Sequence, residues 1–241
     1  KSDSWIDYST LEGCLRDDLD PKAVRAMAVL DPVQLTISNW DELMGTGTLD
    51  DCHAPVHPHH PELGQRHFKF GKSLWIERSD YEETPPKGFF RLFPGNKVRL
   101  KYGYVIECTG ANKDSNGHVT EVLAQLIPDT KSGTPGSDSV KVKGVMTWVA
   151  QADAVAAEVR LYDRLFNEAN PDSGGKDFLS CLNPDSLKVI QAYVEPALAK
   201  SSPDAKFQFE RHGYFVADRS DYSCDKPVFN RCTGLKDTWS K

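Results

Sequence analysis

The stretch from Lys87 to Ile106, KGFFRLFPGNKVRLKYGYVI, carries the clearest structural pattern in the chain. Within it, charged and apolar residues alternate, with Lys97, Arg99 and Lys101 on one side and Val98, Leu100 and Tyr102 on the other. This period of two predicts a strand with one cationic face and one buried face. Pro94-Gly95-Asn96 predicts a tight turn before the strand. Guanidinium groups and aromatic rings presented together can bind unpaired bases, but an ordinary solvated strand face over core aromatics explains the same pattern.

The composition favours one large or two modest globular domains. The chain has 241 residues, of which 39% are hydrophobic and 27% charged. No run of about 18 apolar residues occurs, so we expect no membrane span. The first residues, KSDSWIDYST, contain neither an apolar targeting segment nor a methionine. We therefore expect a segment of a longer protein.

The charge is unevenly distributed along the chain. Its net value is −6, which argues against a generally basic nucleic-acid binder. The window from Gln65 to Lys101 nevertheless holds nine Lys or Arg against four Asp or Glu, a local net charge of +5 that leaves −11 for the remainder. This asymmetry favours an anionic ligand bound at one place.

The cysteines and histidines give weaker signals. Six irregularly spaced cysteines without a CxxC motif predict free thiols in a reducing cytosol, although a Cys224–Cys232 disulfide stays open. The stretch 52–60, CHAPVHPHH, offers zinc ligands, but its spacing fits no closed site and its prolines favour an extended surface loop. We expect no metal, and we find no catalytic motif.

Short strands dominate the predicted secondary structure. A helix is expected over Ser4–Leu19, with Ser4 as its cap and Asp7 in capping-box spacing. Two short helices are expected at Ala152–Ala156 and Pro184–Val189. Turn signals between apolar runs predict a barrel or sandwich. The expected strands are Val33–Ile37, His67–Phe70, Ser73–Arg78, Phe89–Phe93, Lys97–Glu107, Thr120–Leu126, Val140–Val149, Glu158–Leu165, Lys206–Arg211 and Tyr214–Ala217.

A second polar cluster lies at KFQFERHGYF, residues 206–215. Phe207 and Phe209 alternate with Gln208 and Glu210, which would project from one strand face, and Arg211 follows. Gln and Glu together supply donors and acceptors suited to a base edge, and Arg adds a two-pronged donor. Taken alone, the pattern favours a strand edge with a local salt bridge.

Many short motifs in this order resemble glutaminyl-tRNA synthetase, in particular the C-terminal anticodon-binding region of the bacterial type. The resemblance covers nearly the whole chain. The motifs include RAMAVLDPV at 25–33, LWIERSD at 74–80, EVRLYDRLF at 158–166, FQFER at 207–211, KPVFNR at 226–231 and DTW at 237–239.

The resemblance implies a mainly β fold of two tandem six-stranded antiparallel barrels, similar to a ribosomal 5S-RNA-binding protein, after a short helical connector. It implies a connector tail at 1–23, a proximal barrel from 24–62 and 157–241, and a distal barrel from 63–156. It also implies that ATP is used only by a catalytic domain outside this chain, so no cofactor and no catalytic residue are expected here. The implied partner is tRNA(Gln), bound by a cytoplasmic monomer.

The resemblance also implies roles for individual residues. Arg25, Gln208 and Glu210 would form the pocket for the middle anticodon base, U. Arg91 would hold the last base and Arg99 the first, with Lys101 nearby and Arg211 in support. These roles agree with the preference of Arg for guanine edges and phosphates.

The chain departs from the best-known bacterial pattern at Gly88, Phe90, Lys101 and His59. Gly88 and Phe90 replace polar residues, so reading of the last base would depend more on Arg91, with Phe90 available for stacking. Lys101 replaces an arginine and loses the two-pronged geometry. Two alternatives stay open: a related glutamyl-tRNA synthetase, and a stand-alone RNA-binding barrel protein.

Overall fold

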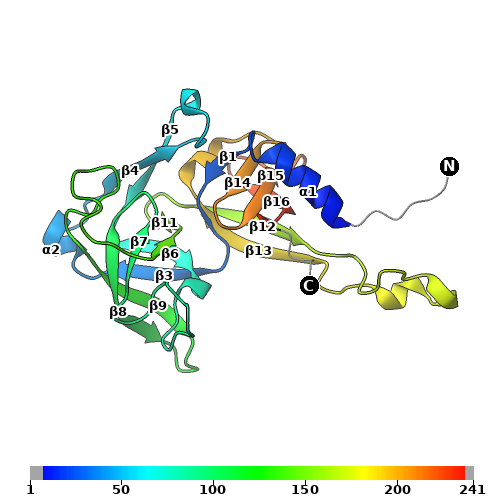
Figure 1. The fold of residues 1–241 in the computed structure, drawn as a ribbon, viewed down its shortest axis with the longest axis horizontal. Helices are drawn as coiled ribbons and strands as arrows, with labels where there is room; N and C mark the ends of the chain where they lie inside the picture. The colour runs from blue at the N-terminus through cyan, green and yellow to red at the C-terminus, as the bar shows by residue number, and fades with distance from the viewer. Residues whose placement is uncertain (1–7, 237–241) are drawn as a thin grey trace.

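A computed structural model of the chain describes residues 8–236. It shows two barrel-shaped sheets side by side, with helix α1 (Tyr8–Leu19) against the sheet that contains β16 (Val228–Thr233) (Figure 1). The predicted mainly β architecture of two barrels is confirmed. Of the helices within residues 8–236, none is long and apolar enough to cross a membrane.

Barrel A contains the C-terminal third of the chain and a short early segment. Its strand order is β1-β14-β15-β16-β12-β13-β2. Phenylalanine rings fill its core, among them Phe209 stacked on Phe215 with centroids 4.2 Å apart. The strand bounds are β1 Val24–Ala26, β2 Ala28–Val29, β12 Val155–Tyr162, β13 Leu187–Val194, β14 Lys206–Phe209, β15 Gly213–Ala217 and β16 Val228–Thr233.

Barrel B contains the middle of the chain. Its strand order is β10-β7-β8-β9-β3-β6-β11, and its core includes Trp40, Phe70 and Trp148, each no more than 1% exposed. The strand bounds are β3 Pro32–Ile37, β6 Ser73–Glu77, β7 Lys97–Leu100, β8 Val105–Lys113, β9 Val119–Leu126, β10 Gly144–Met146 and β11 Trp148–Ala150. Strand β3 lies in this sheet, whereas the resemblance implied that segment 24–62 belongs to the proximal barrel. The predicted domain boundaries stay a prediction.

Each barrel is closed by one pass of the chain that is interrupted at a single residue. Strands β1 and β2 flank Met27 and pair at opposite ends of sheet A, with β14 and β13. Strands β10 and β11 flank Thr147 and pair at opposite ends of sheet B, with β7 and β6. If the two strands of each interrupted pass are counted as one, each sheet has six strands, the number that the resemblance implies. Four pairings are parallel: β1–β14, β10–β7, β12–β16 and β3–β9.

The remaining elements cover or connect the barrels. Helix α1 (Tyr8–Leu19) packs near β16, and its buried Leu19 contacts Ala23 and Tyr214. The predicted helix is confirmed from Tyr8 onward, whereas its proposed cap lies outside the described residues. Helix α2 (Trp40–Met44) and the ribbon β4 (Asp50–Pro55) with β5 (Gln65–Phe70) belong to the barrel B side. Short 3₁₀ helices occur at Pro61–Leu63, Arg78–Asp80, Ser173–Gly175, Phe178–Cys181 and Pro196–Lys200.

The alternation that predicted a strand at Lys97 is confirmed through Leu100. Val98 and Leu100 are fully buried, while Lys97 is exposed. The expected strand Lys97–Glu107 is wrong in its length, because Tyr102 adopts a left-handed φ of 62° and the chain turns before β8 begins. The turn predicted at Pro94-Gly95-Asn96 is confirmed.

Three other expected elements are wrong. Residues 89–93 form no strand and make only an isolated bridge between Leu92 and Tyr81. The expected helices at Ala152–Ala156 and Pro184–Val189 are turns that lead into β12 and β13, which pair with each other over eight residues. Alanine and valine in such short runs form strands when a long partner strand is available.

The expected surface loop at 52–60 is also wrong in part. Its first half is strand β4, where Cys52 and Ala54 pack into the barrel B core. His57 is 1% exposed, and its Nε2 lies 3.0 Å from the Asp20 carbonyl oxygen. All six cysteines are free thiols.

Candidate nucleic-acid interface

Arg25 and Gln208 lie next to each other because β1 and β14 pair in parallel with these two residues in register. The buried Arg25 guanidinium donates to the Ala23 carbonyl (2.8 Å) and to the Asp20 carboxylate (2.8 Å). Gln208 Nε2 donates to the Tyr214 hydroxyl, which donates to the same carboxylate, both at 2.9 Å. The Tyr214 hydrogen bond is the main cause of the lowered pKa of Asp20, with Arg25 adding to it. Asp20 therefore orients both predicted base contacts.

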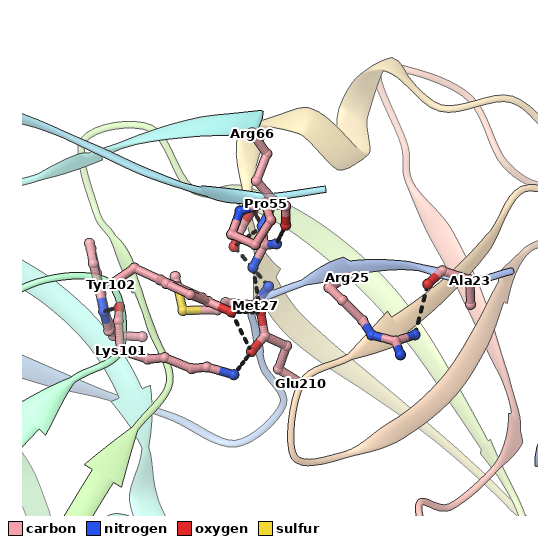
Figure 2. Close-up of polar contacts among 10 residues, drawn as sticks. Ala23, Arg25, Met27, Pro55, Arg66, Lys101, Tyr102 and Glu210 are labelled. Atoms are coloured by element: carbon pink, nitrogen blue, oxygen red, sulfur yellow. Dashed lines mark hydrogen bonds and ion pairs between the residues drawn. The ribbon is translucent and has the colours of Figure 1, made fainter. Parts of the chain in front are cut away.

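Glu210 lies where the two barrels meet. It follows β14, and its backbone N–H donates to the Ala26 carbonyl at 2.9 Å. Its buried carboxylate accepts from Arg66 and Lys101, and from the Tyr102 hydroxyl at 3.2 Å. Figure 2 shows Lys101 and Tyr102 reaching Glu210 from barrel B, while Arg25 points away toward Ala23. The fold thus brings Lys101 and Glu210 together but directs Arg25 elsewhere.

Arg66 connects this cluster to a second buried carboxylate. Its Nε lies 2.9 Å from Glu195, which also accepts from the Met27 N–H at 2.9 Å. Burial raises the pKa of Glu195 to about 7, against the opposing charge of Arg66. We call Arg66, Lys101, Tyr102, Glu195 and Glu210 the joint. It carries two cations and two carboxylates, and it lies at the interruption that closes barrel A.

A parallel contact lies at the interruption of barrel B. Asp80 is fully buried and accepts two hydrogen bonds from Arg211, at 2.6 and 2.7 Å. Arg91 Nε lies 3.1 Å from the same carboxylate, and Arg211 also reaches the Thr147 hydroxyl at 3.4 Å. Asp80 therefore holds two predicted site residues, one from each barrel, in a fixed arrangement.

A histidine–carboxylate contact lies beside Arg211. His212 Nε2 is 3.0 Å from the Glu77 carboxylate, which accepts hydrogen bonds from the N–H groups of Leu30 and Asp31. Burial pushes the pKa of Glu77 upward, but His212 and these two N–H groups outweigh it and leave the pKa lowered. Near the same boundary, Trp75 of barrel B stacks on Tyr193 of barrel A, with centroids 4.7 Å apart. Polar and apolar contacts together fix the barrels against each other.

Arg99 lies apart from these clusters. Its guanidinium donates to the Thr130 carbonyl (2.8 Å) and the Ser132 hydroxyl (3.2 Å), and also to the Ser137 carbonyl. Within residues 8–236, its hydrogen-bond partners lie in Gly103 and the loop 129–138. Arg99 therefore holds this loop against β7.

Two residues of the interface have left-handed backbone angles that non-glycine residues rarely adopt. Tyr102 has a φ of 62° and Arg211 a φ of 73°. Each sends its side chain into an inter-barrel contact. Backbone strain that persists in this way is common at functional sites, where the surrounding structure imposes it.

The structure groups the seven predicted residues as three pairs and one separate arginine. The pairs are Arg25 with Gln208, Lys101 with Glu210, and Arg91 with Arg211. Sequence reasoning did not select Arg66, Tyr102, Asp80 or Glu195 as site residues. The motif LWIERSD contains Asp80 and could have pointed to it, whereas nothing local distinguishes Arg66 or Glu195.

The fold and this charged inter-barrel surface are those of a β-barrel anticodon-binding module. Two family models, both described as tRNA synthetases class I (E and Q), anti-codon binding domain, match residues 23–127 and 145–218. The chain belongs to this family.

Highly similar relatives cover the chain from end to end. A protein named glutamine–tRNA ligase from Cupriavidus taiwanensis is 66% identical over 241 residues, which is 100% of this chain and 40% of the relative. The protein of that name from Cupriavidus necator is 65% identical with the same coverage. The one from Bordetella avium is 58% identical over 240 residues, with 100% of this chain and 40% of the relative covered. The chain thus spans about two fifths of the length of these relatives.

Proposed function

We propose that this chain is the anticodon-binding part of a glutamine–tRNA ligase and that it recognises the anticodon loop of tRNA(Gln). The match of the anticodon-binding family across both barrels carries this proposal. The names of the relatives favour the glutamine over the glutamate enzyme. In such a ligase, ATP-dependent activation of glutamine would belong to the rest of the protein. We further propose a cytoplasmic monomer.

We propose that the middle anticodon base binds at the inter-barrel boundary, near Arg25, Gln208 and Glu210. A carboxylate offers about four acceptor positions, and Glu210 uses three of them for Arg66, Lys101 and Tyr102. One position is left for the N–H of a base. Of the five N–H groups of Arg25, three are used. The Gln208 amide can both donate and accept, as a uracil edge requires.

The other four predicted residues would flank this base. The Arg91 side chain is 42% exposed, more than those of Arg25 (9%) and Arg211 (27%), and Asp80 fixes its orientation for the last base. Arg211 would act through Asp80 by positioning Arg91. Lys101 would balance the charge of Glu210 beside the phosphates. Arg99 would reach the first base with the loop 129–138 that it holds.

A binding titration with two anticodon stem-loops tests the proposal. One stem-loop carries CUG, the glutamine anticodon, and the other CUC, a glutamate anticodon, at one stated salt concentration. We expect tighter binding to CUG. Tighter binding to CUC would place the chain in a glutamate enzyme. Equal binding to both would refute discrimination by the barrels.

A further inference from the structure

Phe90 is an exposed aromatic ring in the segment where a strand was expected. Half of its surface is accessible, although it lies between the partly buried Phe89 and Arg91. The Lys143 ammonium lies 5.2 Å from the centre of the ring, within the range of a cation–π contact. An exposed aromatic ring beside cations can stack on an unpaired base.

The backbone that carries this ring is held on both sides. Gly144 of β10 packs so closely that a Cβ at this position would lie 2.0 Å from the Phe90 carbonyl oxygen. Leu92 is fully buried, its N–H donates to the Asp80 carbonyl at 2.9 Å, and its carbonyl accepts from Glu82 at 3.0 Å. The ring is therefore presented from a fixed position, which lowers the entropy lost when a partner binds.

The charge around the ring suits an anionic partner. The segments 87–91 and 141–143 contain four cations and no carboxylate: Lys87, Arg91, Lys141 and Lys143. The three lysines are exposed. A phosphate chain can follow these cations while its base stacks on the ring.

We propose that Phe90, supported by Lys143, is a stacking platform for one unpaired base of the anticodon loop. The proposal rests on the proposed function and adds a contact to it. We call Lys87, Phe90 and Lys143 the rim. A phenyl ring offers no hydrogen-bonding group, and every base has a π-face, so the platform adds affinity with little preference among bases. Selection of the last base then falls to the neighbouring Arg91, whose guanidinium can hydrogen-bond a base edge.

Affinity measurements with the CUG stem-loop test the platform. Alanine substitution of a ring that stacks on a base weakens binding about 5- to 150-fold, and we expect this loss for Phe90→Ala. Phe178→Ala is the matched control, because Phe178 is equally exposed (50%) but lies in the segment between β12 and β13. We expect the control to bind within twofold of the unmodified chain.

Fluorescence of Phe90→Trp gives a second, independent measurement. The chain has five tryptophans, so the signal of the new one is obtained by difference from the unmodified chain. We expect added quenching when saturating stem-loop binds, and none for Phe178→Trp. If the stem-loop binds but Phe90→Ala binds equally well and Phe90→Trp is not quenched, the platform is refuted and the proposed function stands. If the unmodified chain binds no stem-loop, both are refuted.

Discussion

The joint and the rim are both rich in cations, yet they use them in opposite ways. At the joint, the side chains of Arg66, Glu195 and Glu210 are at most 5% exposed, and they bind one another. At the rim, Phe90 is half exposed and the lysines face solvent. Buried charges are costly unless paired, so the charged groups of the joint must pair with one another. The rim has no such requirement.

This difference predicts that the proposed RNA-binding surface combines two kinds of residue. We expect joint residues to support both the fold and RNA binding, because they close the barrels and fix them to each other. We expect rim residues to support RNA binding alone. Substitutions at the joint and at the rim should therefore separate the unfolding free energy from the dissociation constant.

The largest expected effect is that of Arg66→Ala at the joint. It leaves two buried carboxylates short of a cation, Glu195 without any, and removal of one partner from a buried pair typically costs about 3–5 kcal/mol. Urea unfolding measures the loss. Arg219→Ala is the control: its side chain is 80% exposed and pairs with Asp204, so about 1 kcal/mol or less is expected. Equal losses for both variants would contradict the comparison.

The pH dependence of stability should report Glu195. Its pKa is raised from 4.5 to about 7, so the folded chain keeps a proton there that the unfolded chain releases. This contribution to the unfolding free energy is complete below pH 4.5 and is lost as the pH rises through about 7. Its slope is at most about 1.4 kcal/mol per pH unit.

Glu195→Gln cannot titrate, so the unfolding free energy of the unmodified chain relative to this variant should fall between about pH 5 and 7. Glu168→Gln is the control with the opposite sign, because the Lys176 ammonium, 2.8 Å away, lowers the pKa of Glu168. The contribution of Glu168 to stability is present above pH 4.5 and is lost only as the pH falls below that value. The difference in unfolding free energy between this control variant and the unmodified chain should stay constant between about pH 5 and 7. If the difference in unfolding free energy between Glu195→Gln and the unmodified chain does not change with pH, the Glu195 carboxylate stays ionised throughout.

Arg91→Ala should weaken binding of the CUG stem-loop by about 1–3 kcal/mol and relax the choice of the last base. Arg211 remains bound to Asp80 in this variant, so the fold keeps its buried ion pair. Titration with stem-loops that differ at the last base measures both effects. Arg78→Ala, with a similarly exposed side chain (45%), serves as control. An equal loss on every loop sequence would reduce Arg91 to a phosphate contact.

The smallest expected effect belongs to Lys143→Ala at the rim. Loss of an exposed cation–π contact is worth about 0.5–1 kcal/mol, and loss of one phosphate contact lowers the slope of log K against log salt by about one. Titrations at several salt concentrations measure both. For the unmodified chain we expect affinity to fall steeply with salt. Unchanged slope and affinity in the variant would remove Lys143 from the RNA surface.

The sequence predicts those parts of the fold that depend on local pattern. Val98 and Leu100 alternate with charges, and Phe207 and Phe209 with polar residues, so their strands were predicted and are confirmed. Strands β1, β2, β4, β13 and β16 were missed. In β13, exposed positions outnumber buried ones, and the pairing with β12 rather than alternation makes it a strand.

The predicted site shows the same division. Residue type made Gln208 and Glu210 candidates, because their side chains suit base edges, and the family resemblance selected them together with Arg91; their role in RNA binding stays a prediction. The partners that hold them were not predictable in this way. Glu210 meets Arg66 across 144 residues of sequence, and Arg211 meets Asp80 across 131. Such contacts arise from barrel closure and leave no local signal.

Crosslinking from the middle anticodon base tests the central claim most directly. A CUG stem-loop with 4-thiouridine at that position is irradiated in complex with the chain, and the modified peptides are identified by mass spectrometry. The account predicts crosslinks in both barrels, within 24–29 or 206–213 of barrel A and within 97–104 of barrel B. Crosslinks confined to one barrel, or to the segment 163–186 between β12 and β13, would contradict it.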